Sequence, residues 1–290
     1  MRIFLRKILV KILSKERQQH LKRFEYKSKK SIIENLPKIS EERLQEILVK
    51  ELGIQKGDNL FIHSSLDMIN TDLNPLDILR IILDVIGKEG SLSVPTFTKY
   101  LSKDWMLMKK EFNIRRTPSG MGTFSEIVRR DKNALRSLHP TKSVATIGKI
   151  AHTLLDEHHL DIYQFGKKSP FYKLIQHDVK IVGLGVSMPL SMVHTVEDVY
   201  HAEHPVEVNE KELFEKNCID RDKNSISVKT FVHNPKVIVK ANSKKFVKQY
   251  MKREDYVVYK HYFTPFYMVK GKQLFEELVS QMRDGNTIYN

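Results

Sequence analysis

Hydrophobic and polar positions follow two rhythms along the first two thirds of the chain. Apolar residues spaced three to four apart predict helices, and short unbroken apolar runs predict strands. The predicted elements are helices over residues 41–52, 75–87, 123–130 and 148–158, and strands within 57–66, 91–98 and 180–185. Ser40 can cap the first helix and Gly53 can end it, Pro75 suits the first turn of the second, and Thr123 with Glu126 forms a capping box for the third. The opening α-β-α-β order predicts a parallel sheet covered by helices.

Residues 180–205 contain the densest set of reactive side chains. They predict a buried strand, a glycine-rich turn and a helix. In that helix His194, Glu197 and His201 share one face at i, i+3 and i+7, and Asp198 lies on its flank. A histidine beside a carboxylate, at the C-terminal end of a strand, is a candidate general base. The alternative is a row of solvated polar residues on an exposed helix face.

The pattern changes after residue 205. The predicted elements are a hairpin of 226–232 with 236–241 turned at 233–235, a helix over 243–254, strands over 255–263 and 265–270, and a last helix over 272–283. This region is therefore expected to be richer in β-structure than the first 205 residues.

Composition sets limits on the environment of the protein. The chain has 290 residues, of which 41% are hydrophobic, enough for a substantial core. It has no unbroken apolar run of about 18 residues, so no membrane-spanning helix is predicted. The single cysteine, Cys218, allows no internal disulfide and fits a reducing, cytoplasmic compartment. Cys218 lies in a polar stretch, and no role is predicted for its thiol.

The positive charge is concentrated at the N-terminus. The formal net charge is +14, and residues 1–30 carry 11 Lys or Arg against 2 Glu, a net of +9. Residues 1–39 form a basic arm, and within it residues 1–15 fit an amphipathic helix on an anionic membrane surface. The alternative is a helix packed on the body of the protein or on a sister subunit of an oligomer. Nucleic acid is not expected as a partner, because no groove-reading motif is present.

Several polar segments follow predicted strands, where an α/β sheet would gather them at one edge. They are His63-Ser64-Ser65, Thr96-Phe97-Thr98, the segment 136–143 and the surroundings of His194. Together they favour an enzyme of small-molecule metabolism over a scaffold.

Six motifs in order carry a resemblance to a known family. They are FIHSSL, LSVPTFT, TPSGMG, RSLHPTKSVATIG, FGKKSP and VGLG followed by VHTVE. The chain resembles the aminoglycoside 3-N-acetyltransferase family over residues 40–205, and only loosely after 205. The resemblance implies an α/β fold, a three-layer α/β/α sandwich with a mostly parallel central sheet and an additional β-rich C-terminal element. Residues 40–290 would then be one acetyltransferase domain, with a catalytic core over 40–205 and a β-rich acceptor-side region over 206–290.

The resemblance also implies a reaction and its residues. Acetyl-CoA would donate an acetyl group to an amine of a sugar, with His194 as base, Glu197 as its nearest supporting carboxylate, and no metal. The positions that match the family's coenzyme A groove are His63, Ser64, Ser65, Leu66, Thr96, Phe97, Thr98, Thr117, Met121, Gly122, His139, Pro140 and Ser143. A neutral imidazole can take the proton of an ammonium ion, and donors at the 63–65 segment can stabilise the thioester oxygen as it becomes negative. No covalent acyl-enzyme is required.

The sequence departs from the family after residue 205. Val232, His233 and Asn234 stand where carboxylates that would meet a polycationic drug are expected. A basic protein without those acids suits an anionic acceptor, such as a nucleotide-linked or lipid-linked amino sugar of cell-surface polysaccharide biosynthesis, at the inner face of the membrane. The alternative acceptor is an aminoglycoside antibiotic.

Two further classes compete with a transferase. A metal hydrolase could use His194, Glu197 and His201, although i and i+7 lie about 10.5 Å apart along a helix. An inactive, membrane-docked scaffold would bind membranes but not acetyl-CoA.

Overall fold

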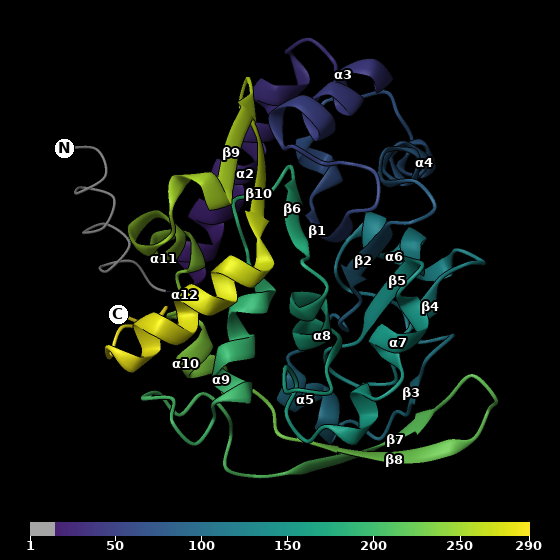
Figure 1. Ribbon diagram of the computed structural model, residues 1–290, viewed down its shortest axis with the longest axis vertical. Coiled ribbons are helices and arrows are strands. Elements are labelled where there is room, and N and C mark those ends of the chain that lie inside the picture. Colours follow the sequence, from purple (N-terminus) through teal and green to yellow (C-terminus); the bar gives the residue numbers. More distant parts are fainter. Residues whose placement is uncertain (1–14) are drawn as a thin grey trace.

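The computed structural model describes residues 15–290 and contains a seven-stranded sheet (Figure 1). Its strand order is β4 (Leu135–Arg136), β5 (Val144–Gly148), β2 (Ser91–Pro95), β1 (Asn59–Ser64), β6 (Lys180–Leu184), β10 (Thr264–Lys270) and β9 (Tyr256–His261). The three central strands β2, β1 and β6 are parallel, as predicted. The flanking strands pair antiparallel, so the sheet is mixed.

Both faces of the sheet are buried, because successive side chains of the central strands point to opposite faces and are apolar on each of them. In β1, Leu60 and Ile62 face one core cluster and Phe61 faces the other. Helices α3 (Glu41–Glu46), α4 (Pro75–Ile86) and α6 (Thr123–Arg130) contribute to the first cluster. Helices α7 (Ala151–Leu155), α8 (Pro170–Gln176), α9 (Thr195–Val199), α11 (Ser243–Tyr250) and α12 (Gly271–Arg283) contribute to the second. The predicted three-layer α/β/α sandwich is thereby confirmed.

The caps of the first helices are largely as predicted. Ser40 accepts a hydrogen bond from the Arg43 N–H, and the helix continues as the π-helical turn η1 (Ile47–Glu51). Pro75 lies in the first turn of α4. The prediction of a capping box formed by Thr123 and Glu126 is wrong. Gly122 is the N-cap residue of α6, and Glu126 instead accepts a hydrogen bond from the Ser119 N–H.

A second sheet contains β3 (Phe112–Asn113), β7 (Phe214–Ile219) and β8 (Ser225–Thr230). It runs along the lower edge of the view in Figure 1. The hairpin predicted between 226–232 and 236–241 is wrong, because β8 pairs with β7. Residues Pro235–Ile238 form helix α10, whose start is set by the Asn234 cap and by proline in the first turn.

Cys218 is fully buried in this second sheet, although its neighbours in the sequence are polar. Phe214, Lys216 and Cys218 alternate inward along β7, and the Lys216 ammonium reaches the carbonyl oxygens of Met108 and Lys110. Met108 directly follows α5 (Ser102–Leu107). Burial raises the pKa of the Cys218 thiol to about 12, so the thiol is not activated.

The N-terminal arm is more helical than predicted. Helix α2 (Lys15–Glu34) extends through most of the arm beyond the predicted amphipathic segment at 1–15, and Ile33 near its end is buried. The Asn70 amide then donates to the Leu36 carbonyl, and the Ile39 N–H donates to the Asn70 carbonyl. Residues 1–14, which make up nearly all of the predicted membrane-binding segment, lie outside the described residues. No helix within residues 15–290 is long and apolar enough to cross a bilayer.

The remaining described elements are short 3₁₀ turns. They are η2 (Leu66–Met68), η3 (His158–Leu160), η4 (Ser191–His194) and η5 (Arg253–Asp255).

Candidate functional site

His194 lies beyond the carboxyl end of β6, at the junction of η4 and α9. The single long helix predicted here is wrong, because the chain forms a 3₁₀ turn and then only five α-helical residues. His201 lies past the end of α9 and stacks on Tyr163, with ring centroids 4.3 Å apart. The break after Val199 therefore gives His201 a different neighbour from His194.

Glu197 is the carboxylate that holds His194. The His194 Nδ1 lies 2.9 Å from Glu197 Oε2, and the Tyr289 hydroxyl donates to Glu197 Oε1 at 2.7 Å. The Glu197 side chain is 0% exposed and that of His194 is 17% exposed. Burial opposes ionisation of Glu197, but the His194 and His233 charges and the two hydrogen bonds outweigh it and keep the Glu197 pKa below its ordinary value. The site is thus a buried anion that carries a partly exposed imidazole.

A second buried carboxylate, Asp198, lies beside this pair. It accepts hydrogen bonds from the Phe165 N–H at 2.8 Å and from the Asn209 amide at 2.9 Å. The His233 Nε2 lies 3.6 Å from Asp198 Oδ2, and the His233 ring centroid lies 5.0 Å from that of His194. Sequence reasoning missed His233 as a site residue and treated it only as a missing acid.

Tyr289 was also missed. It is the penultimate residue of the chain, 92 positions from Glu197, and no sequence motif marks it. Its hydroxyl stays protonated because burial and the Glu197 charge raise the Tyr289 pKa. It can therefore act only as a donor to Glu197 over the working pH range.

The predicted polar tip after β1 does reach the surroundings of His194. His63 is buried, and its Nε2 accepts a 3.4 Å hydrogen bond from the Ser191 N–H in η4. Burial lowers the His63 pKa to about 4, so this ring is neutral and acts as an acceptor. Gly185 has φ +71°, and a Cβ there would approach the Ser65 carbonyl to 2.5 Å, so glycine allows β6 to pass close to the tip.

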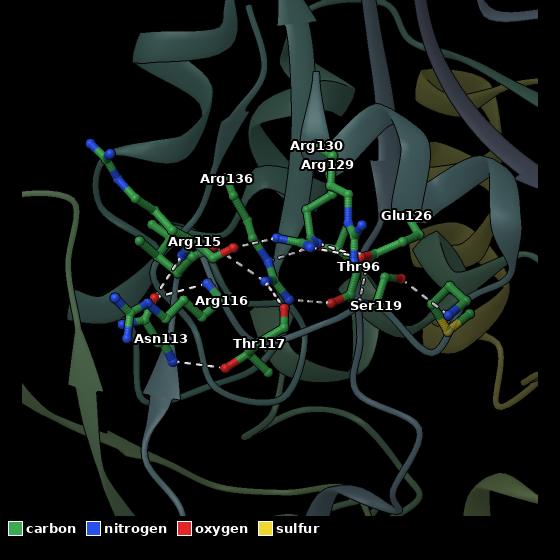
Figure 2. Close-up of polar contacts among 12 residues, drawn as sticks. Thr96, Asn113, Arg115, Arg116, Thr117, Ser119, Glu126, Arg129, Arg130 and Arg136 are labelled. Carbon is green, nitrogen blue, oxygen red and sulfur yellow. Dashed lines mark hydrogen bonds and ion pairs between the residues drawn. The ribbon is translucent and has the colours of Figure 1, made fainter. Parts of the chain in front are cut away.

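A guanidinium organises the other predicted loops (Figure 2). Arg136 donates to the hydroxyls of Thr96 and Ser143, both at 3.1 Å, and to the Thr96 and Thr117 carbonyls at 2.7 and 2.5 Å. The Arg136 side chain therefore ties together the ends of β2, β4 and β5 and the 114–117 loop. Burial, together with the nearby Arg129 charge, lowers the Arg136 pKa to about 9.

The residues predicted for a coenzyme groove divide into two groups. His63, Thr96, His139, Pro140 and Ser143 are buried, and His139 stacks on His158 with centroids 4.2 Å apart. The others are partly or fully exposed: Ser64, Ser65, Leu66, Phe97, Thr98, Thr117, Met121 and Gly122. The buried group supports the loops, and only the second group is accessible to a ligand.

Three cavities surround these residues. The central cavity, about 200 Å³, is lined by Phe97, Thr98, Met121, Lys142, His233 and others. The basic cavity, about 430 Å³, shares Thr98 and Tyr100 with it and adds Trp105, Lys99, Lys110, Arg116 and Thr117. The glutamate cavity, about 340 Å³, is lined by Tyr163, Glu197, His201, Glu207, Glu210, Phe231 and others.

The catalytic candidates lie between these cavities. Glu197 lines the glutamate cavity, and His233, next to His194, lines the central cavity. Lys142 lies over the rings of Phe97 and Phe165 at 4.7 and 5.9 Å, and burial lowers its pKa to about 8. His194 therefore lies beside one lining residue of each of these two cavities.

A family profile and individual relatives of known sequence all indicate the same protein family. Residues 61–280 match the sequence profile of the family described as aminoglycoside 3-N-acetyltransferase. The chain is 28% identical over 161 residues to the SPbeta prophage-derived aminoglycoside N(3')-acetyltransferase-like protein YokD of Bacillus subtilis (strain 168), which covers 49% of this chain and 59% of that one. It is also 28% identical over 177 residues to aminoglycoside N(3)-acetyltransferase IX of Micromonospora chalcea, covering 56% and 60%. The chain thus spans about three fifths of the curated relatives that it matches.

Solved structures share the fold. The crystal structure of aminoglycoside acetyltransferase AAC(3)-Xa superposes with a TM-score of 0.70 at 18% identity, covering 89% of this chain and 95% of that one. AAC-IIIb, described as binary with CoASH, superposes with a TM-score of 0.68 at 18% identity, covering 86% and 97%.

Proposed function

Because this chain belongs to the aminoglycoside 3-N-acetyltransferase family, we propose that it transfers the acetyl group of acetyl-CoA to an amine of an amino sugar. The observation that carries this proposal is the His194–Glu197 pair, which lies between the central cavity and the glutamate cavity. An imidazole held by a buried carboxylate is the arrangement that general-base transfer to an amine needs.

In this proposal the coenzyme occupies the basic and central cavities. Lys99, Lys110 and Arg116 offer cations to its phosphates, and Trp105 and Tyr100, stacked 5.8 Å apart, offer an aromatic wall. The thioester would then extend past Phe97 and Met121 toward His194. The solved relative described as binary with CoASH supports coenzyme A as the ligand class.

The reaction follows from the site residues. His194 takes a proton from the acceptor ammonium, the amine nitrogen bonds to the thioester carbon, and the carbon–sulfur bond breaks. The proton on His194 then neutralises the departing thiolate, and the nitrogen, now part of an amide, releases its remaining extra proton to water. Glu197 stabilises the imidazolium, and Tyr289 keeps Glu197 ionised.

The oxygen that becomes negative during attack needs donors. The Ser65 N–H already donates to the Leu184 carbonyl at 2.9 Å, so this amide is engaged. The hydroxyls of Ser64 and Ser65 make no hydrogen bond to other described residues, and both side chains are partly exposed. We assign the oxyanion contact to these hydroxyls.

The acceptor is assigned to the glutamate cavity. Glu207 is exposed and has no ion-pair partner among the described residues, while Glu210 pairs with Lys103 at 3.0 Å. These acids lie in the segment 203–212, next to the stretch at 232–234 from which carboxylates are missing. They supply the negative wall that a polyamino sugar requires, so an aminoglycoside-type acceptor is the reading that the structure and the relatives favour.

A nucleotide-linked or lipid-linked amino sugar is the second candidate acceptor. The net charge of +14 favours it, and Lys211 also lines the glutamate cavity. The relatives named above are described as aminoglycoside acetyltransferases or acetyltransferase-like and give no support for a role in polysaccharide biosynthesis. Binding of residues 1–15 to an anionic membrane stays a prediction.

One assay separates these readings. Release of free coenzyme A is measured with a panel of aminoglycosides and free and nucleotide-linked amino sugars. We expect the highest kcat/KM with an aminoglycoside, and a loss of about 10²–10⁴-fold in kcat for His194→Ala with the acetyl-CoA thermal shift retained. Faster turnover of nucleotide-linked sugars would make them, rather than aminoglycosides, the acceptor class. Unchanged turnover of His194→Ala would show that His194 is not the base.

A further inference from the structure

His233 is buried without a hydrogen-bonding partner for its ring. It is 3% exposed, and neither Nδ1 nor Nε2 makes a hydrogen bond among the described residues. A buried imidazole that makes no hydrogen bond through either nitrogen is costly, so the ring is suited to a ligand that the polypeptide does not supply.

Three side chains converge at this point. One ligand atom each from His194, Glu197 and His233 lie within 4.8 Å of one another. In a tetrahedral zinc site with ligands at about 2.0–2.1 Å, ligand atoms are about 3.3 Å apart, so closure over about 1.5 Å by side-chain rotation would complete the geometry. Two histidines and one carboxylate form a donor set that zinc uses, with a fourth position open. The residues differ from the sequence-predicted set, because His233 takes the place of His201.

The surroundings contain the outer partners that metal ligands need. The Asp198 carboxylate lies 3.6 Å from His233 Nε2, and the backbone N–H of Phe165 and the amide of Asn209 hold that carboxylate in place. With Nε2 on the Asp198 side, Nδ1 is the nitrogen left for an ion. Tyr289 holds Glu197 in the same way. A carboxylate behind a histidine orients the ring and raises its basicity toward a metal.

Charge and access also fit a cation. Glu197 and Asp198 are two buried carboxylates, and the Lys142 ammonium is the nearby cation that opposes them. The central cavity, which His233 lines, gives access from solvent.

We propose that His194, Glu197 and His233 bind one Zn²⁺ ion, and that the bound ion inhibits the enzyme by occupying the ring that serves as the base. The inhibitory part rests on the proposed function, whereas the binding part does not. Zn²⁺ on His194 removes the lone pair that would accept the proton of the amine, so metal binding and acetyl transfer exclude one another.

The experiment is titration calorimetry of the untagged, chelator-treated protein with ZnCl₂. We expect one ion per chain in the wild-type protein, and a loss of affinity of about 100-fold or more in His233→Asn. The matched control is His177→Ala, an exposed histidine outside the cluster, which is expected to bind Zn²⁺ as the wild type does. No binding by the wild-type protein, or equal binding by His233→Asn, would overturn the proposal.

Two further measurements keep the outcomes separate. If His233→Asn does not fold, His194→Asn replaces a more exposed ligand of the same ion and is expected to lose the same affinity. In the coenzyme-release assay Zn²⁺ is expected to abolish turnover, and EDTA to restore it. Zinc binding by a chain that shows no turnover in metal-free buffer would refute the proposed function alone, and full turnover of the Zn²⁺-saturated protein would refute the inhibition.

Discussion

Replacing Tyr289 by phenylalanine tests the buried support of the base. The substitution keeps the ring and removes only the hydroxyl that donates to Glu197 Oε1 at 2.7 Å. The Glu197 side chain is 0% exposed, so water cannot readily replace the lost donor. The remaining contact of this carboxylate is the one to His194 Nδ1.

The expected loss of stability follows from the charge on Glu197, which accepts the hydrogen bond from Tyr289. A hydrogen bond to an ionised group contributes about 1.5–3 kcal/mol, and leaving a buried anion short of a donor adds to the penalty. We therefore expect the free energy of unfolding of Tyr289→Phe to fall by about 2 kcal/mol at pH 7. Since Tyr289 also keeps Glu197 ionised, kcat should fall as well, by up to about tenfold.

The loss of unfolding free energy in Tyr289→Phe is expected to become smaller as pH falls. The pKa of Glu197 is lower in the folded protein than in the unfolded chain, so its stabilisation is present above the unfolded value of 4.5 and disappears as pH falls through the folded pKa. The difference between wild type and Tyr289→Phe should therefore shrink as Glu197 becomes protonated.

The assay is urea unfolding of both proteins at pH 7 and at the lowest pH at which both remain folded. Tyr200→Phe is the matched control, because the Tyr200 hydroxyl makes no hydrogen bond among the described residues, and its removal should change the unfolding free energy by less than about 0.5 kcal/mol. If Tyr289→Phe and wild type unfold with equal free energies at pH 7, the hydroxyl does not stabilise the buried carboxylate and the reasoning is refuted.

Three other predictions concern the acceptor wall, the guanidinium and the buried histidines. Glu207→Gln should raise KM for a polyamino acceptor about 2–5-fold without changing KM for acetyl-CoA, and an unchanged acceptor KM would exclude Glu207 from binding. Arg136→Met should lower the unfolding free energy by at least about 3 kcal/mol in urea, since several buried acceptors lose their donor; a loss below 1 kcal/mol would contradict this. His63, His139 and His158 have pKa values lowered chiefly by burial, so their stabilisation is complete above pH 6.5 and is lost as pH falls. Three protons taken up on unfolding give a slope of about 4 kcal/mol per pH unit near pH 5, and a flat profile between pH 6.5 and 5 would show that these rings are not buried neutral.

Short sequence patterns, such as apolar runs and helix-capping residues, predicted the elements of the fold well where the apolar residues are buried in the core. The apolar runs of β1, β2 and β6, the Ser40 cap and Pro75 in the first turn of α4 could be predicted without knowledge of a distant partner. The predicted hairpin after residue 225 is wrong, because two segments that are adjacent in the sequence were assumed to pair with each other. Asn234 and Pro235 start a helix there, and β8 takes the preceding strand as its partner.

The candidate site divides in the same way. His194 and Glu197 are three residues apart, so spacing alone placed a carboxylate beside the imidazole, and the 2.9 Å contact needs only one turn of chain. The groove residues were predicted as one set, yet burial separates loop supports such as Thr96 and Ser143 from accessible residues such as Phe97. Exposure depends on what covers a side chain, which no local pattern contains.

The sequence by itself determined the alternation of strands and helices, the family and the pairing of His194 with Glu197, because each depends on residues a few positions apart. Only the tertiary structure decided that Tyr289 donates to Glu197, that His233 lies beside His194, and that Glu207 lines the same cavity as Glu197. These contacts join segments far apart in the chain, and they form because packing the two faces of the sheet brings the segments together. Their chemistry therefore depends on the whole fold.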